Sequence, residues 1–202
     1  MRPHLPLLGI AAGPLLMAAI GLTHPGSLTP DTAEHWTAMH TALIPFFPLI
    51  GINLAWLVAG VPGVLPWLVR VAAFAYAVCY PAVDLLAGVA AGRLVMLGQD
   101  PYAPTVSAMF DRGNAVGDVG IGALLVGSLL ALAVLWRALR WRVLPGGVLL
   151  ILGVYLFGEN HIYRPLGVLG MVVLALAFAW LLRARQVAVT EAELRRQRLP
   201  RR

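Results

Sequence analysis

Residues 115–136 read AVGDVGIGALLVGSLLALAVLW, an unbroken apolar run that contains one charged side chain, Asp118. A helix needs about 20 apolar residues to cross the hydrocarbon core of a bilayer. The run is followed at once by Arg137, the kind of residue that marks the end of a membrane span. This segment therefore predicts a transmembrane helix, and similar runs lie on both sides of it.

The composition of the whole chain agrees with this segment. The 202 residues are 60% hydrophobic and 12% charged, with a mean hydropathy of +0.82. Soluble domains average roughly 45–50% apolar and 25% charged residues. These values exclude an ordinary soluble globular protein, a disordered chain and a disulfide scaffold. The single cysteine, Cys79, lies inside an apolar run and has no partner for an internal disulfide. We expect an all-α, polytopic transmembrane bundle.

Six segments are long and apolar enough to be predicted spans. They are residues 5–22, 41–60, 65–91, 115–136, 143–158 and 166–182. The first resembles a secretory signal peptide in its short basic start, but no clear A-x-A site follows it, so we expect a retained helix. The fifth is short enough for a re-entrant loop to be the alternative.

The placement of arginine sets the predicted orientation. All 15 basic residues are Arg, and the net charge is +6. With six spans, twelve arginines lie on the side of the termini and three, Arg93, Arg112 and Arg164, lie on the other. If the fifth segment were re-entrant, the seven arginines of the tail would lie on the outer side of the membrane, which would break the positive-inside rule. Both termini are therefore predicted to be cytoplasmic.

This orientation divides the chain into two expected parts. Residues 1–185 form a six-helix transmembrane domain, and residues 186–202 form a basic cytoplasmic tail. Thr190 and Glu193 fit a capping box, which predicts a helix that starts within the tail. The all-Arg composition rich in Ala, Gly and Leu is typical of a GC-rich genome, so we expect the plasma membrane of a prokaryote.

The chain has no Walker A loop and no G-x-G-x-x-G, G-x-S-x-G or H-E-x-x-H motif. Function must therefore be argued from the polar residues near the outer ends of the spans. After the first span, Thr29 and Pro30 predict a helix start, and the helix runs through Trp36 and His40 on one face. Pro45 and Pro48 are expected to kink the junction of this helix with the second span. An interfacial anchor is the alternative role for Trp36.

The third span carries Tyr76, Tyr80 and Asp84 at a spacing of four, which predicts one stripe on a helix. Counted outward from Arg70, Asp84 lies roughly 9 Å inside the outer boundary of the membrane. A carboxylate there is expensive, so we expect it to face the bundle interior and to have a partner. A purely structural buried acid is the alternative.

Two further groups of polar residues lie at the same predicted level. Asp111, Asn114 and Asp118 open the fourth span on one face. Glu159 and His161 lie in a polar turn between the last two spans, where His161 is either an acid–base group or a histidine in the lipid headgroups.

We expect these groups to converge on one outward-facing pocket. The predicted metal ligands are His40 and His161, with His24 as a further candidate, and the predicted catalytic carboxylates are Asp84, Asp118 and Glu159. Tyr80, Asn114 and Trp36 complete the predicted site. Imidazole with carboxylate suits Zn, Fe or Cu and supports redox or hydrolytic chemistry. Haem is the other expected cofactor, with the outer arginines on its propionates.

Three other functions stay open at the level of sequence. A proton-coupled transporter would use Asp84 and Asp118. A non-catalytic assembly subunit would use the polar outer face as a partner surface, and a metal-free enzyme would use acid–base groups alone. The expected partners are the lipid bilayer and either a lipophilic small molecule or another membrane protein. Nucleic acid is not an expected partner.

Overall fold

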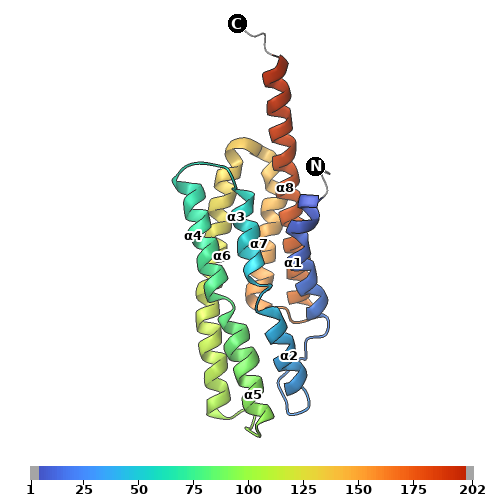
Figure 1. The fold of residues 1–202 in the computed structure, drawn as a ribbon, viewed down its shortest axis with the longest axis vertical. Coiled ribbons are helices and arrows are strands. Elements are labelled where there is room, and N and C mark those ends of the chain that lie inside the picture. The colour runs from blue at the N-terminus through green and yellow to red at the C-terminus, as the bar shows by residue number, and fades with distance from the viewer. Residues whose placement is uncertain (1–4, 199–202) are drawn as a thin grey trace.

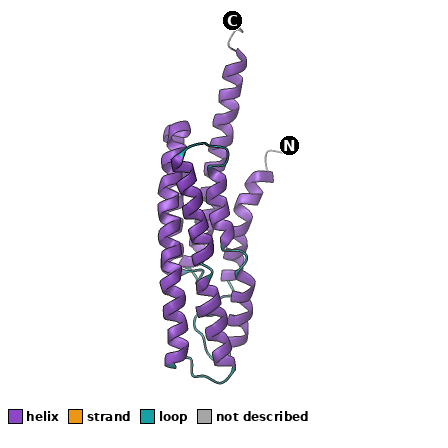
Figure 2. Cartoon of the chain, turned by 60° about the vertical axis from the view of Figure 1, so that its left-hand side comes forward, coloured by secondary structure: helices purple, strands orange, loops and turns teal. Residues whose placement is uncertain are grey.

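The structure is a computed structural model that describes residues 5–198, and these residues form helices joined by short loops, without a strand (Figures 1 and 2). The predicted all-helical class is confirmed. The elements in chain order are α1 (Leu5–Gly21), α2 (Ala33–Leu43), α3 (Pro48–Leu57), α4 (Val64–Cys79), the π-helix η1 (Val83–Ala90), α5 (Ala91–Met96), α6 (Pro104–Leu139), the 3-10 turn η2 (Arg140–Arg142), α7 (Val143–Asn160) and α8 (Leu166–Arg198).

Four helical stretches are long and apolar enough to cross a membrane. They are Ala33–Leu57, Val64–Met96, Pro104–Asn160 and Leu166–Gln197, and α1 is a shorter apolar helix. The third stretch is folded back on itself at η2, so that α6 and α7 run side by side in opposite directions (Figure 1). The helices enclose a continuous core of buried aliphatic and aromatic side chains that includes Phe47, Phe157 and Phe178.

The outer surface of the bundle is apolar in a way that soluble proteins avoid. Phe74 and Val148 are 69% and 67% exposed. Large apolar side chains stay exposed along α1, α3, α4, α6, α7 and α8, which is the surface expected of helices that face lipid. Five of the six tryptophans lie toward the end of the bundle where the described N- and C-terminal residues and η2 are found, as in an aromatic belt. These five are Trp56, Trp67, Trp136, Trp141 and Trp180.

The helices end at two different levels on the side away from the termini. The 36 residues of α6 extend for about 54 Å and the 18 residues of α7 for about 27 Å, at roughly 1.5 Å per residue. As a result α2, α5 and the first half of α6 project beyond the ends of α1, α7 and α8 (Figure 1). A second, smaller apolar core holds the projecting part together. Its buried residues are Leu28, Ala33, Trp36, Ala91, Val95 and Val106.

Two predicted helix starts are wrong. The helix expected to begin after Thr29 begins at Ala33, because Thr29 and Thr32 hydrogen-bond to each other in a turn. The helix expected from residue 115 begins at Pro104, so Asp111, Asn114 and Asp118 lie within α6 and not at its opening. The proline kink is confirmed as a break between α2 and α3, and the predicted span 41–60 is therefore not one continuous helix.

The tail and the third span also differ from expectation. The α8 helix runs on to Arg198 without a new start, and the Thr190 hydroxyl donates to the Gln186 carbonyl inside it, so the predicted capping box is wrong. The third span changes to a π-helix, η1, shortly after Pro81. Proline lacks the N–H of a regular helical turn, and its ring crowds the preceding turn, which accounts for an irregularity at this point.

Candidate metal centre

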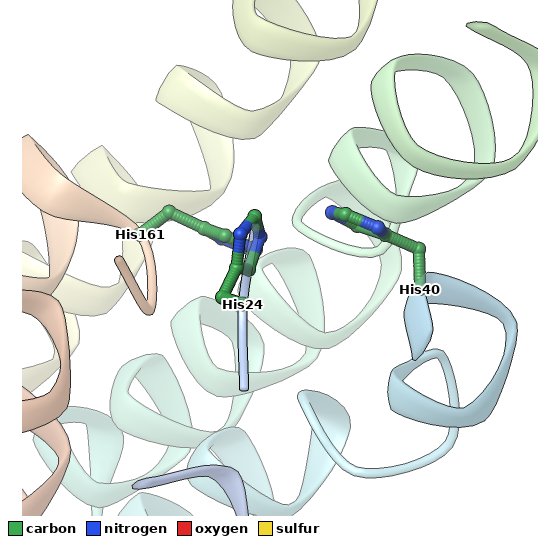
Figure 3. Close-up of side chains that lie close together, drawn as sticks. All are labelled: His24, His40 and His161. Atoms are coloured by element: carbon green, nitrogen blue, oxygen red, sulfur yellow. The ribbon is translucent and has the colours of Figure 1, made fainter. Parts of the chain in front are cut away.

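Three histidines from distant parts of the chain meet where the helices end at different levels. One ring nitrogen from each of His24, His40 and His161 lies within 4.8 Å of those from the other two. Figure 3 shows the three rings turned toward one another, and their centroids form a triangle with sides of 5.1, 5.9 and 5.9 Å. The sequence predicted all three as metal ligands, and the structure brings them together.

Each histidine is placed by a different break in the helical structure. His24 follows the C-terminal end of α1, and His40 lies in the last turn of α2 just before the chain kinks. His161 ends α7 with a backbone φ of +50°, in the left-handed region. A residue other than glycine in that region costs of order 1 kcal/mol or more, and such strain is often found at functional sites.

The turn that carries His161 approaches α1 closely. A Cβ on Gly21 would lie 2.6 Å from the Ile162 carbonyl oxygen, and a Cβ on Gly167 would lie 2.5 Å from the His161 carbonyl oxygen. Both positions therefore require glycine. This close approach brings the loop of His24 next to the turn of His161.

The Nδ1 atom of every histidine in the cluster already has a hydrogen-bond partner. Nδ1 of His24 donates to the Pro25 carbonyl at 2.7 Å, and Nδ1 of His40 donates to the Trp36 carbonyl at 2.7 Å. Because a carbonyl only accepts, both Nδ1 atoms carry the hydrogen. Nδ1 of His161 lies 2.8 Å from the Tyr80 hydroxyl, a group that can either donate or accept in this hydrogen bond.

The Nε2 atoms of His24 and His40 are therefore left with free lone pairs, because Nδ1 carries the ring hydrogen in both. Nε2 of His24 and Nε2 of His161 are buried without a hydrogen-bond partner among the described residues. His40 is 2% exposed, and its Nε2 makes no hydrogen bond to any residue that the structure describes. Buried polar atoms are rarely left unsatisfied, so two such atoms side by side call for a ligand. Imidazoles fixed through Nδ1–H with Nε2 free are arranged as in protein metal sites.

Burial also keeps His24 and His161 in the neutral form that binds metals. Desolvation lowers the pKa of His24, an effect opposed by its bond to the Pro25 carbonyl. Burial holds the pKa of His161 well below its ordinary value, and the neighbouring His40 and His24 lower it further. Both imidazoles are therefore neutral at pH 7, and neither must lose a proton before it binds a cation.

Aromatic rings enclose the cluster on several sides. Tyr163 lies 4.0 Å and Trp36 lies 5.1 Å from His24 between ring centroids, and Phe47 lies 5.2 Å from His161. Burial raises the pKa of Tyr163 to about 12, so its phenol is neutral. These aromatic rings pack against the imidazoles and limit how far they can turn.

The separation of the nitrogens fits a single metal ion after a small closure. Nitrogens bound tetrahedrally to one zinc ion at about 2.0–2.1 Å lie roughly 3.4 Å apart. The rings would therefore move inward by roughly 1 Å from the observed separation, which is within the reach of small side-chain rotations. Three protein ligands leave a fourth tetrahedral position open, as in catalytic zinc sites.

Three other predicted site residues lie around the cluster. Trp36 is 2% exposed and donates from Nε1 to the Ala87 carbonyl at 3.1 Å, so it belongs to the core and not to an interfacial belt. Tyr80 contacts His161 directly. Asp84 is completely buried as expected, but the expected partner is missing, since neither carboxylate oxygen has a hydrogen bond among the described residues.

The remaining predicted residues lie elsewhere. Asp118 and Glu159 have exposed side chains and line a separate groove of about 320 Å³ between α6 and α7. Asn114 is exposed on α6. The expected single pocket is therefore divided, because α6 turns this polar face away from the three histidines.

Sequence reasoning missed two residues of the cluster. Gly88 lies against His40, and a Cβ at this position would clash with the imidazole. Gly88 lies four residues after Asp84 and eight after Tyr80, and this spacing could have placed it on the same helix face as both. Tyr163 packs on His24, and its position two residues after His161 gave no comparable signal.

Comparison with known proteins adds no assignment. No protein-family model, curated protein or solved structure matches this chain. The candidate function therefore depends on the geometry of the site.

Proposed function

We propose that this chain is an integral membrane metalloprotein that binds one divalent transition-metal ion, with Zn²⁺ as the first candidate, through Nε2 of His24, His40 and His161. The observation that carries the proposal is that two buried imidazoles and a partly buried one each bring a ring nitrogen within 4.8 Å of the other two. Their Nδ1 atoms make hydrogen bonds, and Nε2 of His24 and of His161 is buried without a partner among the described residues. No thiol or thioether belongs to the group, and an all-imidazole site suits Zn²⁺ or Cu²⁺ better than a soft monovalent ion.

The open fourth position gives the proposed ion a chemical role. A zinc ion with three histidines and one water lowers the pKa of that water to about 7 and makes it a nucleophile. The chain itself supplies fixed ligands and an aromatic wall that excludes bulk water. The proposed site lies near the membrane boundary. We therefore propose hydrolysis of a small or lipophilic substrate that reaches the site from the outer membrane surface. Bound Cu²⁺ would favour redox chemistry instead.

The proposed topology follows from arginine placement and helix length. Among the described arginines, Arg70, Arg137, Arg140, Arg142, Arg183 and Arg185 lie on segments at the end of the bundle where the termini are found, and Arg93, Arg112 and Arg164 lie on segments toward the other end (Figure 1). We propose six crossings, a cytoplasmic tail and a site on the extracytoplasmic face of a prokaryotic plasma membrane. The length of α7, about 27 Å, is close to that of a hydrocarbon core of about 30 Å, which supports a position for His161 near the proposed outer boundary.

A proton-coupled transporter fits the described residues less well. Five polar or charged residues are buried there, namely His24, His40, Asn53, Asp84 and Ser128. Of these, Asn53 donates to the Ile10 carbonyl and is satisfied within the bundle. The core toward the basic end is aliphatic and aromatic, so no chain of ionisable groups continues through it.

The test is metal analysis of the full chain purified in mild detergent. We expect about one Zn²⁺ or Cu²⁺ per chain after reconstitution, and a tetrahedral visible spectrum when Co²⁺ replaces the native ion. The double variant His40→Asn/His161→Asn keeps the hydrogen-bond donor nearest Nδ1 and removes Nε2, so it should lose the ion. His35→Gln is the matched control, because His35 is exposed on the same helix and bonds through Nε2 to the Thr23 carbonyl. A wild-type protein without stoichiometric metal, or a double variant with unchanged metal, would overturn the proposal.

A further inference from the structure

Asp84 lies on the helix face that touches two of the three histidines. Tyr80, Asp84 and Gly88 are spaced by four residues and form one stripe from the end of α4 into η1. At one end of the stripe, the Tyr80 hydroxyl contacts His161. At the other end, Gly88 packs against the His40 ring. The carboxylate of Asp84 therefore projects from the segment between these two contact points.

Asp84 is buried as completely as any residue of the core, and its carboxyl group has no hydrogen-bond or ion-pair partner among the described residues. Its side chain is 0% exposed, and both oxygens are without a hydrogen-bond partner in the part of the chain that the structure describes. The one salt bridge among those residues, Arg142–Glu191, lies at the opposite, basic end of the bundle. An unpaired acid inside a membrane bundle is costly, and such residues usually serve a function.

The backbone around Asp84 is irregular at the same place. Asp84 is the second residue of the π-helix η1, which continues as far as Ala90 and so includes Gly88. The wider turn of a π-helix is uncommon and is often found at functional sites. Gly88 within this turn gives the His40 ring the space that it occupies.

We propose that the buried carboxyl of Asp84 releases its proton when a divalent ion enters the trihistidine site, and that the resulting negative charge stabilises this ion and makes the site selective for divalent over monovalent ions. The inference rests on the proposed metal-binding function. Three neutral imidazoles contribute no charge, so a divalent ion among them would leave two uncompensated positive charges in an apolar surrounding. Asp84 lies outside the group of ligand atoms, and it therefore acts through its field and not as a fourth ligand.

The dependence on ionic charge gives the inference a specific signature. A Coulomb interaction with one carboxylate is twice as large for a divalent ion as for a monovalent ion at the same place. Loss of a group that supports the ligands typically weakens metal binding by about 10–100-fold. Asp84→Asn should therefore weaken Zn²⁺ binding by about 10–100-fold and Ag⁺ binding by only about the square root of that factor.

The experiment measures Zn²⁺ and Ag⁺ affinities of the detergent-purified full chain by competition with chelators of known affinity. Asp118→Asn is the matched control, because that carboxylate is exposed in the groove between α6 and α7 and should leave both affinities unchanged. Equal weakening of Zn²⁺ and Ag⁺ by Asp84→Asn would assign Asp84 a structural role and overturn the inference. Unchanged Zn²⁺ affinity would also overturn it, while leaving the proposed function standing.

Thermal stability provides a second measurement, in which Asp84→Asn is compared with wild type both without metal and with Zn²⁺. The substitution should have different effects in these two states. Without metal, Asp84→Asn should unfold at the same temperature as wild type or higher, because an unpaired buried acid is removed. With saturating Zn²⁺, the variant should gain less stability than wild type, since stabilisation follows affinity. A variant less stable in both states would contradict the inference. Asp84→Ser, which is smaller and uncharged, repeats both measurements if the Asn variant does not fold. A wild-type protein that binds no Zn²⁺ would overturn the proposed function and this inference together.

Discussion

The Tyr80 hydroxyl lies 2.8 Å from Nδ1 of His161, a residue 81 positions later in the chain. This hydrogen bond connects the stripe of α4 and η1 to the turn between α7 and α8. It also holds the ring of His161, whose Nε2 is buried without a partner among the described residues. In metal sites a partner of this kind sets the tautomer and the orientation of the ligand. Tyr80 is therefore expected to control the geometry of a site that it does not itself bind.

Replacing Tyr80 by Phe should weaken Zn²⁺ binding by about 10–100-fold while the fold is kept. The ring remains and retains its packing on Phe47 and Phe157, so only the hydroxyl is lost. Tyr76→Phe is the matched control. Its ring stacks on Tyr80 at 5.4 Å, but its hydroxyl has no partner among the described residues. Chelator competition on both variants provides the comparison, and equal affinities would remove Tyr80 from the supporting role.

Gly88→Ala should disrupt the site by displacing His40. The added Cβ would occupy the space of the imidazole, and overpacking of this kind typically costs about 1–3 kcal/mol. We expect a lower melting temperature and loss of stoichiometric Zn²⁺. In the control Gly122→Ala, the new Cβ meets no atom within 4 Å, so stability should be equal or slightly higher. Full Zn²⁺ binding by Gly88→Ala would show that His40 is not held by this contact.

The sequence predicts the helices well and singles out the three histidines that lie close together, because both depend on local patterns. Apolar run length predicts the helices, and His24, His40 and His161 stand out as polar residues at helix ends. Their meeting point was not predictable in the same way, because it depends on how far each helix projects. The span prediction for residues 115–136 missed the first 11 residues of α6, because polar side chains interrupt the apolar run there although the helix is continuous.

The separation of Asp118 from the histidines shows a second limit of sequence reasoning. Helical spacing places Asp111, Asn114 and Asp118 on one face, but it does not say which neighbour that face meets. In the structure, the glycine face of α6 packs on the bundle instead. A Cβ on Gly117 would meet Val83, and a Cβ on Gly120 would lie 2.9 Å from the backbone nitrogen of Tyr80. The acids therefore point away from the cluster, for a reason that the small residues beside them already indicated.

Acid should destabilise the metal-free protein because of His24 and His161. Burial lowers the folded-state pKa of both below the ordinary value of 6.5, so the unfolded chain binds more protons between those values. Stability is therefore fully present above about pH 6.5 and is lost as the pH falls toward the folded pKa values. Each histidine contributes a slope of about 1.4 kcal/mol per pH unit within its window.

Melting temperatures measured in EDTA between pH 7.5 and pH 5 test this dependence. The wild-type melting temperature should fall steadily below about pH 6.5. The double variant His24→Asn/His161→Asn should show a flatter profile, because Asn keeps a donor for the Pro25 carbonyl but does not titrate. A wild-type profile as flat as that of the double variant would mean that the two imidazoles are not held in a desolvated state.

Cysteine labelling tests on which side of the membrane the site lies. In a Cys79→Ala background, Ser27→Cys places a thiol in the exposed loop that carries His24, and Leu194→Cys places one near the described end of α8, where Leu194 is 49% exposed. Because the arginines gather at the α8 end, a membrane-impermeant maleimide should label Ser27→Cys in intact cells and Leu194→Cys only after permeabilisation. Both variants should label in detergent, which controls for access. The reverse pattern would place the trihistidine site on the cytoplasmic side. Its ion would then come from the tightly buffered cytoplasmic pool, and the proposed outer-surface substrate would have no route to the open coordination position.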